Sequence, residues 1–396
     1  MAIISQSGIS GITSITSSGQ SITFYTASGS NSQLSFDNLN LSAINNGSIS
    51  GTRNKIFNGD CRIDQRNNGS SGTATGVYTV DRWYYFASQA SKGTWQQNAG
   101  SVTPPIGFTN YLGYTSSSAY SPLAADIFGL AQAIEGYNIS DLAWGTSSAK
   151  TVTLSFWVRS SLTGQFGGFL KNGGNLVQGN SNRFCGFSYN INSANTWEYK
   201  TITFPGDTSG SWDSTNGSGL AVAFSLGSGS TNIGGTPLTW GSTFYQQPSS
   251  STNIVSTNGA TFYITGIQLE IGTVASVFER RSYGQELALC QRYFYSTTST
   301  GSNTQYQNQR TTTSGNYGGA FPQHVHFPVQ MRTSPNCTVY TNSTRANSGN
   351  VLVNATTAST GWSSQISSMT FAHWNNGALA NVGDYYTFYL DASSEL

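Results

Sequence analysis

Runs in which apolar and polar residues alternate place the strongest constraint on how this chain folds. In residues 150–159, Val152, Leu154 and Phe156 fall on one face of an extended strand, and the residues between them fall on the other. Runs of the same period occupy residues 197–204, 220–226 and 261–270. Gly, Asn, Ser and Pro bound each run, and short strands joined by such loops are typical of β-sandwiches and β-barrels. The sequence therefore predicts an all-β chain.

Composition excludes several alternatives to a folded β protein. Charged residues make up 8% of the chain, against about 25% in an average soluble domain, and a Gly- and Ser-rich chain of this kind could be disordered. However, 9 Trp, 21 Tyr and 21 Phe can bury a large apolar area, so we expect a folded core. The net charge of +1 disfavours binding to nucleic acid, which needs clustered Lys and Arg. No apolar stretch approaches 18 residues, so we expect no membrane insertion.

Changes in pattern along the chain predict three parts. Residues 1–52 carry isolated Ile, Leu and Phe among Ser, Gly, Thr and Asn, with short alternations at 21–25 and 33–36. This thin β-rich segment is too poor in apolar residues to close a core alone. It is either a flexible leader or a segment that orders against copies of itself or another protein, and its regular apolar positions favour the second. Residues 53–284 and 285–396 each predict a β-sandwich domain.

Two stretches have helical character. Residues 123–137 place apolar side chains at helical spacing, among them Ile127 and Ile134, so we predict a short helix there. The alternative is a strand around residues 131–135. Residues 285–294 predict one or two helical turns that join the two β domains.

Five motifs stand out along the chain: residues 58–66 (NGDCRIDQR), 78–83 (YTVDRW), 267–273 (IQLEIGT), 278–293 (FERRSYGQELALCQRY) and 327–335 (FPVQMRTSP). The first four resemble the opening and the end of a module found in bacteriophage tail and structural proteins, and the last resembles a motif of the domain that usually follows. The resemblance extends over about residues 54 to 396 and implies a virion protein. Its first module is similar in layout to the jelly-roll of carbohydrate-binding modules. Sugar binding must be argued from the site, because a fold alone does not determine function.

The acidic residues predict ion pairs in place of a catalytic centre. Asp60, Asp64, Asp81 and Glu279 each lie close in sequence to an arginine, and we expect these pairs to orient loops. Glycoside hydrolysis needs two carboxylates on either side of the sugar, and no acidic pair stands clear of arginine neighbours. No GxSxG motif or Cys/His pairing indicates a nucleophile. We therefore expect no catalytic residues and no enzymatic activity.

The pattern His-Val-His is the one metal-like signal in the sequence. His324 and His326 would face the same side of a strand, because side chains alternate between its two faces. In a homotrimer, three copies would bring six imidazoles around the threefold axis, where octahedral Fe or Ni is a candidate. The alternative is a pair of ordinary surface histidines.

A structural calcium ion is a second candidate cofactor. Asn58, Asp60 and Glu270 are possible oxygen donors, although no EF-hand-like loop is present. The four cysteines have long spacings and no CxxC pattern, so they predict separate buried thiols; their positions are Cys61, Cys185, Cys290 and Cys337.

Aromatic residues are the candidates for glycan binding, because exposed Trp and Tyr faces pack against the C–H faces of pyranose rings. The candidates are Trp157, on the solvent side of a predicted strand, and Trp362 and Trp374 in the C-terminal domain. The polar loops 296–318 and 341–367 are the expected contact regions.

The function that this resemblance and composition favour is host adsorption. We expect a homotrimeric tail fibre whose residues 1–52 attach to other virion proteins and whose C-terminal domain contacts host-surface polysaccharide through several weak sites. The alternative is a capsid decoration or head-fibre protein without a receptor role. A glycan-degrading tailspike is the remote alternative.

Overall fold

The structure is a computed structural model, and the residues it describes belong to one compact unit, Ala43–Leu396. The described stretches are residues 43–44, 47–48, 53–173, 182–298, 306–309, 323–345, 348–353, 356–358, 363–365, 369–375 and 385–396. The strands predicted at 21–25 and 33–36 lie outside them. The first described elements, β1 (Ala43–Ile44) and β2 (Gly47–Ser48), form a small antiparallel pair.

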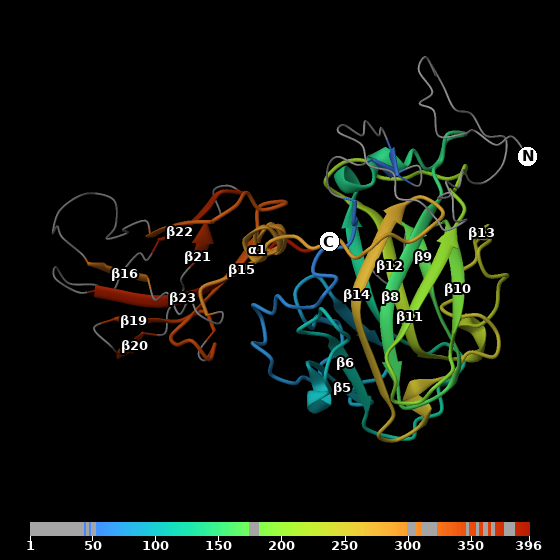
Figure 1. The fold of residues 1–396 in the computed structure, drawn as a ribbon. Coiled ribbons are helices and arrows are strands. Elements are labelled where there is room, and N and C mark those ends of the chain that lie inside the picture. The colour runs from blue at the N-terminus through green and yellow to red at the C-terminus, as the bar shows by residue number, and fades with distance from the viewer. Residues whose placement is uncertain are drawn as a thin grey trace, which may run out of the picture. The chain divides into compact units, whose positions relative to one another are not determined.

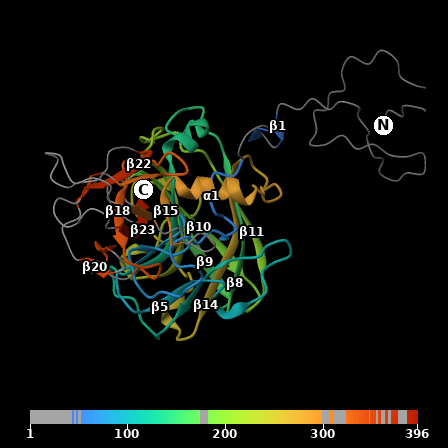
Figure 2. The same cartoon turned by 90° about the vertical axis from the view of Figure 1, so that its left-hand side faces the viewer.

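Two antiparallel sheets packed face to face form a β-sandwich (Figure 1, Figure 2). The larger sheet has the strand order β13 (Trp240–Gly241), β10 (Phe184–Ile191), β9 (Gly164–Asn172), β12 (Ser218–Ser228), β7 (Ile127–Glu135), β4 (Tyr84–Ala87) and β3 (Val77–Tyr78). The smaller sheet has the order β11 (Glu198–Phe204), β8 (Val152–Ser160), β14 (Thr261–Ile271), β6 (Leu112–Ser116) and β5 (Gly93–Gln97). The four alternating runs of the sequence became β8, β11, β12 and β14, and the predicted all-β class is confirmed.

The core lies between the two sheets, because each strand turns its large apolar side chains inward. Phe156 of the smaller sheet meets Phe224 of the larger sheet with ring centroids 5.0 Å apart. Phe187 packs against Phe224 from β10, at 5.9 Å. All three side chains are fully buried, so this aromatic cluster ties the two sheets together.

The helix predicted within residues 123–137 is wrong, and the alternative strand is right. β7 is a strand at the interior of the larger sheet, paired with β4 and β12. Its inward face carries Leu130 and Ile134 but is interrupted by Gln132. The side-chain amide of Gln132 accepts a hydrogen bond from the backbone N–H of Phe57 and donates one to its carbonyl. Its outward face is also buried, with alanines in place of polar residues. These two departures from alternation produced an apparent helical period.

The C-terminal strands form two further antiparallel sheets around a separate small core. The first sheet has β23 (Tyr385–Ser393) at its centre, paired with β15 (Phe294–Ser296), β16 (Tyr306–Gln309), β18 (Asn336–Tyr340) and β19 (Val351–Val353), with β20 (Thr356–Ala358) beside β19. The second has the order β17 (Gln323–His326), β22 (Phe371–Asn375) and β21 (Ser363–Gln365). Val325, Phe327 and Met331 pack against Leu390 in the core that these strands share.

In the part of the chain that the structure describes, one α-helix and five short 3-10 turns interrupt the strands. The helix is α1 (Tyr283–Gln291), where the sequence predicted helical turns, and a capping box between Ser282 and Gln285 begins it. The 3-10 turns are Ala99–Ser101, Gly136–Asn138, Ser140–Leu142, Ser230–Asn232 and Ile254–Ser256. Within the described residues, no helix is long and apolar enough to cross a membrane.

Replacing the aromatic ring at the centre of the sandwich tests this core. We expect Phe156→Ala to lower the free energy of unfolding by about 3 to 5 kcal/mol, since it removes a buried ring and leaves a cavity. Ile106→Ala is the matched control, because Ile106 is fully exposed and its truncation should change stability by less than about 0.5 kcal/mol. Denaturant unfolding measures both, and equal effects would contradict the described core.

Candidate functional site

The outer face of the smaller sheet carries an exposed aromatic pair. Trp157 of β8 lies directly opposite Tyr199 of the edge strand β11, and their ring centroids are 5.3 Å apart. Tyr199 is 43% exposed, whereas Trp157 is half-buried. Neighbouring Thr201 is also exposed on the same strand face. The pair therefore presents aromatic surface next to hydroxyl groups, and this face is turned to the viewer in Figure 1.

A bulge in β14 sets the surroundings of Trp157. The pairing of β14 with β8 shifts between Thr265 and Gln268, and Gly266 within this bulge has a φ of 62°. A Cβ atom on Gly266 would lie 2.6 Å from the ring of Phe108 and 3.2 Å from the ring of Trp157, so only glycine fits there. The missing side chain lets Phe108, from a distant loop, lie beside Trp157.

A second group of rings anchors the loop that borders this pair. Trp197 donates its indole N–H to the carbonyl of Thr103 at 2.9 Å and packs against Tyr111 at 5.5 Å. Tyr111 in turn packs against Tyr263 at 5.2 Å, and both are buried. These rings hold the loop in place and are not available to a ligand, apart from the half-buried Trp197.

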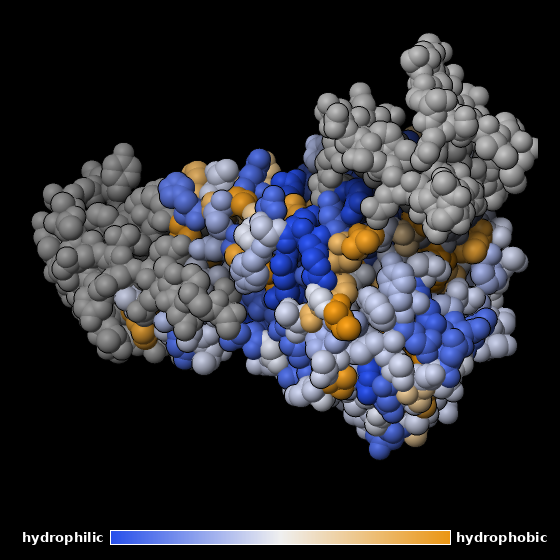
Figure 3. Space-filling model, viewed as in Figure 1, coloured by the Kyte–Doolittle hydropathy of each residue, from blue (hydrophilic) through white to orange (hydrophobic). Residues whose placement is uncertain are grey.

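We name Phe108, Trp157, Trp197 and Tyr199 together the aromatic face. In the view of Figure 1, Figure 3 shows orange apolar side chains scattered among hydrophilic ones on this side of the molecule. The sequence predicted Trp157 alone. Alternation in residues 197–204 could also have placed Tyr199 on the solvent side, but no local pattern in the sequence brings Phe108 to the sheet.

The other predicted glycan-binding residues are not brought to this face by anything the structure describes. Trp362 lies outside the described residues. Trp374 belongs to β22, opposite Gln323 of β17 and Ser364 of β21, and its side chain is not described. Most of the predicted contact loop 296–318 also falls outside the described residues.

The two predicted metal-binding histidines lie on β17, as the alternation argument requires. His326 is exposed and its ring lies 5.9 Å from the ring of Phe371, while the side chain of His324 is not described. Among the side chains that the structure does describe, no three His, Cys, Asp or Glu are grouped to hold a metal ion. The trimer-axis metal stays a prediction.

The predicted calcium donors have protein partners. The carboxylate of Asp60 pairs with Arg62 at 3.3 Å, and that of Glu270 accepts from the hydroxyl of Ser276 at 2.6 Å. All four cysteines are free thiols; Cys61, Cys185 and Cys290 are buried, and Cys337 is half-buried.

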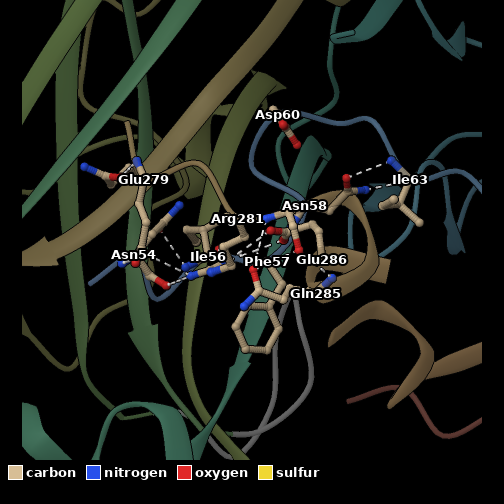
Figure 4. A network of polar contacts seen from close by, with 12 residues as sticks. Asn54, Ile56, Phe57, Asn58, Asp60, Ile63, Glu279, Arg281, Gln285 and Glu286 are labelled. Atoms are coloured by element: carbon tan, nitrogen blue, oxygen red, sulfur yellow. Dashed lines mark hydrogen bonds and ion pairs between the residues drawn. The ribbon is translucent and has the colours of Figure 1, made fainter. Parts of the chain in front are cut away.

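The motif residues around Asn58 build a polar network rather than an open site (Figure 4). The backbone N–H of Asn58 donates to Glu286 of α1 at 2.5 Å. Its side chain bonds both the N–H and the carbonyl of Ile63 and also donates to the carbonyl of Asp81. Its own carbonyl accepts from the indole of Trp83 at 3.0 Å. Asn58 therefore joins three segments that are far apart in the sequence.

Gly59 explains why the motif reads Asn-Gly. Asn58 has a φ of 53°, in the left-handed region that Asn adopts more readily than most residues. A Cβ atom on Gly59 would lie 2.1 Å from the carbonyl oxygen of Ile267 in β14. The backbone N–H of Ile267 also donates to the carbonyl of Gly59 at 2.9 Å, so the two chains approach closely.

Arg281 extends the network from α1 to the start of the domain. Its guanidinium pairs with Glu286 and with Glu279, each at 3.3 Å, and donates to the carbonyl of Asn54. Glu279 accepts from the backbone N–H of Asn54 at 2.7 Å (Figure 4). Both carboxylates of this cluster are therefore occupied by protein donors.

A second buried ion cluster holds the C-terminal tail. Arg82 is 1% exposed, pairs with the carboxylate of Glu395, and donates to the carbonyl of Ala133 at 2.6 Å. Arg66 pairs with the other oxygen of Glu395 at 2.8 Å. The guanidinium of Arg82 also stacks 3.6 Å above the ring of Tyr293.

Every carboxylate in the stretches that the structure describes has a hydrogen-bond or ion-pair partner within the protein. Asp60 and Glu279 pair with arginines, as the sequence predicted, whereas Asp64 accepts from the backbone N–H groups of Asn67 and Gly69. Burial raises the pKa of Asp60 and that of Asp64 above their ordinary values.

Comparison with known proteins gives distant similarity to solved structures. No family model matches the chain, and no curated protein matches it. It is similar to the enzymatically active domain of tailspike protein 4 of bacteriophage CBA120, at 14% identity over 55% of this chain and 21% of that chain, with a TM-score of 0.29.

Two carbohydrate-binding domains are also among the similar structures. One is the family 11 carbohydrate-binding module of Clostridium thermocellum, at 13% identity over 52% of this chain and 98% of that chain, with a TM-score of 0.26. The other is a xylan-binding domain of Paenibacillus barcinonensis, at 12% identity over 53% and 99%, with a TM-score of 0.24. At these values, function has to be argued from the residues of this chain.

Asp81 offers a pH test of the buried clusters. Burial raises its pKa to about 7, against the opposing attraction of Arg66, and nearby Asp64 and Glu395 raise it further. Because the folded state holds this proton more tightly than the unfolded state, Asp81 stabilises the fold below about pH 4, and this contribution is lost as the pH rises through 7.

Between pH 4 and pH 7, we expect the free energy of unfolding of the native protein to fall by up to about 4 kcal/mol relative to that of Asp81→Asn. Denaturant unfolding of both proteins at a series of pH values measures the difference. Asp213→Asn is the control, since Asp213 bonds only its own turn through Thr215. A difference between native protein and Asp81→Asn that does not change with pH would contradict the burial of Asp81.

Proposed function

We propose that this chain is a non-catalytic glycan-binding protein of a bacteriophage particle, and that it contacts sugar through the aromatic face. The observation that carries the proposal is the cross-strand pair of Trp157 and Tyr199, which keeps aromatic surface in solvent on the outer face of the smaller sheet. The motifs that resemble phage virion modules support the setting.

The chemistry of the aromatic face suits an uncharged or weakly charged sugar. A pyranose ring offers C–H groups on its face and hydroxyls at its edge, and stacking on an aromatic ring buries the former. The sugar hydroxyls can form hydrogen bonds with Thr201 and with the backbone around Tyr199, which lie in the same exposed edge strand. Lys200 and Glu198 of the same strand pair with each other at 2.6 Å, so they add little net charge. The guanidinium of Arg280 lies over the ring of Phe108, 4.7 Å from its centroid, and adds one positive charge at the border of the aromatic face.

A binding role without catalysis fits the distribution of carboxylates. Hydrolysis of a glycosidic bond needs one carboxyl group as acid and a second as base or nucleophile, both facing the sugar. On the aromatic face, Glu270 is the carboxylate of β14, and it is buried and bonded to Gln268 and Ser276. Its partners are backbone and side-chain donors of the same region, which is the environment of a structural carboxylate.

In the proposed role, the chain acts as a homotrimeric tail fibre. A single sugar site with one or two stacking rings binds weakly, and several copies on one particle raise the apparent affinity without new contacts. Residues 1–52 would attach the protein to other virion proteins. Trimer formation would give their sparse apolar residues a surface to bury.

Substitution of the aromatic pair tests glycan binding. We expect Trp157→Ala and Tyr199→Ala each to weaken binding to host-surface polysaccharide about tenfold, which corresponds to the loss of about 1.4 kcal/mol from one stacking contact. Tyr137→Ala is the matched control, because Tyr137 is 60% exposed but lies away from the smaller sheet. Glycan-array screening followed by calorimetry measures the affinities, and unchanged binding in both variants would refute the assignment of this face.

Location on the particle tests the remaining part of the proposal. We expect cryo-electron microscopy of whole virions to show three copies per fibre at the tail, with residues 1–52 against the particle. Copies arrayed over the capsid would contradict the tail-fibre role and favour a head-fibre or decoration protein.

A further inference from the structure

All three histidines of this 396-residue chain belong to one pair of neighbouring strands. They are His324 and His326 on β17 and His373 on β22. The two strands are separated by more than forty residues in sequence, so no local pattern joins the third histidine to the first two. Antiparallel pairing of β17 with β22 brings them together.

The register of this pairing places the three histidines on one face. His324 lies directly opposite His373, and His326 lies opposite Phe371. Directly opposite residues of an antiparallel pair share a face, with Cβ atoms about 4.5 to 5.5 Å apart. Residues two apart on one strand also share a face, about 6.6 Å apart. The three positions therefore form a compact triangle on the ladder.

This shared face is the one turned away from the C-terminal core. Val325 and Phe327, at the alternate positions of the same segment, are buried in that core, whereas His326 is exposed. A dissolved ion can therefore reach this face at His326. No described carboxylate of the chain takes part in the pairing, since β17 and β22 contain none.

We propose that His324, His326 and His373 form a binding site for a divalent transition metal of the Zn²⁺ type, built within a single chain. Three histidines with one position left to water is an established ligand set for Zn²⁺, with Zn–N distances of about 2.0 to 2.1 Å. Two histidines separated by one residue on a strand, with a third directly opposite on the paired strand, place three such residues at neighbouring positions of one ladder.

This site differs from the metal expected at a trimer axis. The earlier expectation used only the His-Val-His pattern and needed three chains to complete the ligand set. The register supplies the third histidine from the same chain, so the site needs no second copy and holds one ion per chain. Bound metal would also join β17 to β22 and thereby stiffen the edge of the three-stranded sheet.

Titration of the full-length chain, prepared without a histidine tag and freed of metal with chelator, tests the proposal. Co²⁺ is the spectroscopic probe, and Zn²⁺ is measured by its displacement of Co²⁺. We expect one ion per chain, with visible absorption bands in the range of imidazole-bound, four- or five-coordinate Co²⁺. The thermal unfolding midpoint should rise when Zn²⁺ is added, because the metal binds only the folded chain.

Single substitutions separate the proposed site from its alternatives. We expect His373→Gln, His324→Gln and His326→Gln each to weaken Zn²⁺ binding by at least about tenfold, since loss of even an outer partner of a metal ligand costs about 10- to 100-fold. Gln323→Ala, on the same strand but at an alternate position, is the matched control and should leave the affinity unchanged. Circular dichroism and the metal-free unfolding midpoint show that each variant is folded.

Three results would overturn the proposal. One is the absence of saturable binding by the folded native chain. Another is one ion per three chains, which would return the metal to the trimer axis. The third is full retention of binding in folded His373→Gln, which would remove the residue that distinguishes this site. None of these results bears on glycan binding, because the aromatic face lies on the smaller sheet of the sandwich and shares no residue with β17 or β22.

Discussion

The buried ion pairs around Arg82 are the constraint on which the rest of the structure depends. A guanidinium that is 1% exposed costs several kcal/mol to bury unless it is paired and hydrogen-bonded. Arg82 meets that requirement only when Glu395, the carbonyl of Ala133 and the ring of Tyr293 are all in place. The larger sheet, the residues that follow α1 and the last residues of the chain are therefore fixed by one side chain.

Arginine side chains also join the sandwich to the C-terminal strands. Arg292 makes a two-pronged pair with Glu135 at the end of β7, at 2.5 and 2.9 Å, and the hydroxyl of Tyr293 donates to that carboxylate at 2.7 Å. Arg332, within the FPVQMRTSP motif, donates to the carbonyls of Ser394 and Asn216. These two arginines thus fasten the C-terminal region to the sandwich, and removal of Arg292 would leave the buried carboxylate of Glu135 with the hydroxyl of Tyr293 but without its ion-pair partner.

These anchors decide which surface of the sandwich stays open. The C-terminal Leu396 packs against the apolar cluster on the outer face of the larger sheet, which is built largely from alanines of β7 and β12. The chain covers that face with its own residues, so β7 and β12 are buried on both sides. The outer face of the smaller sheet has no such cover at Tyr199, and aromatic surface remains in solvent there.

How far the sequence predicts this molecule depends on whether a signal is local. Alternation predicted β8 and β14 because one face of each strand is apolar and the other carries hydroxyls or amides. The same reasoning failed for β7, where Gln132 faces inward and alanines face outward. Trp157 could be placed on the solvent side by counting, and the arginine motifs indicated ion pairs. The positions of Phe108 and His373 depend on pairings between segments that are remote in sequence, which no local pattern contains.

The use of charge inside the molecule has a consequence for its surface. Only 8% of the residues are charged, and the carboxylates in the described part of the chain are paired within the protein. Few charges are therefore left to create a long-range electrostatic field around the molecule. Contact with a partner then depends on stacking and on hydrogen bonds from hydroxyls and amides, which act only at short range and respond weakly to salt. Each such contact contributes about 1 kcal/mol, too little to hold a particle by itself. In the proposed role, affinity must come from the number of copies that bind together, and a rigid sandwich with few mobile charged side chains loses little entropy each time one of them binds.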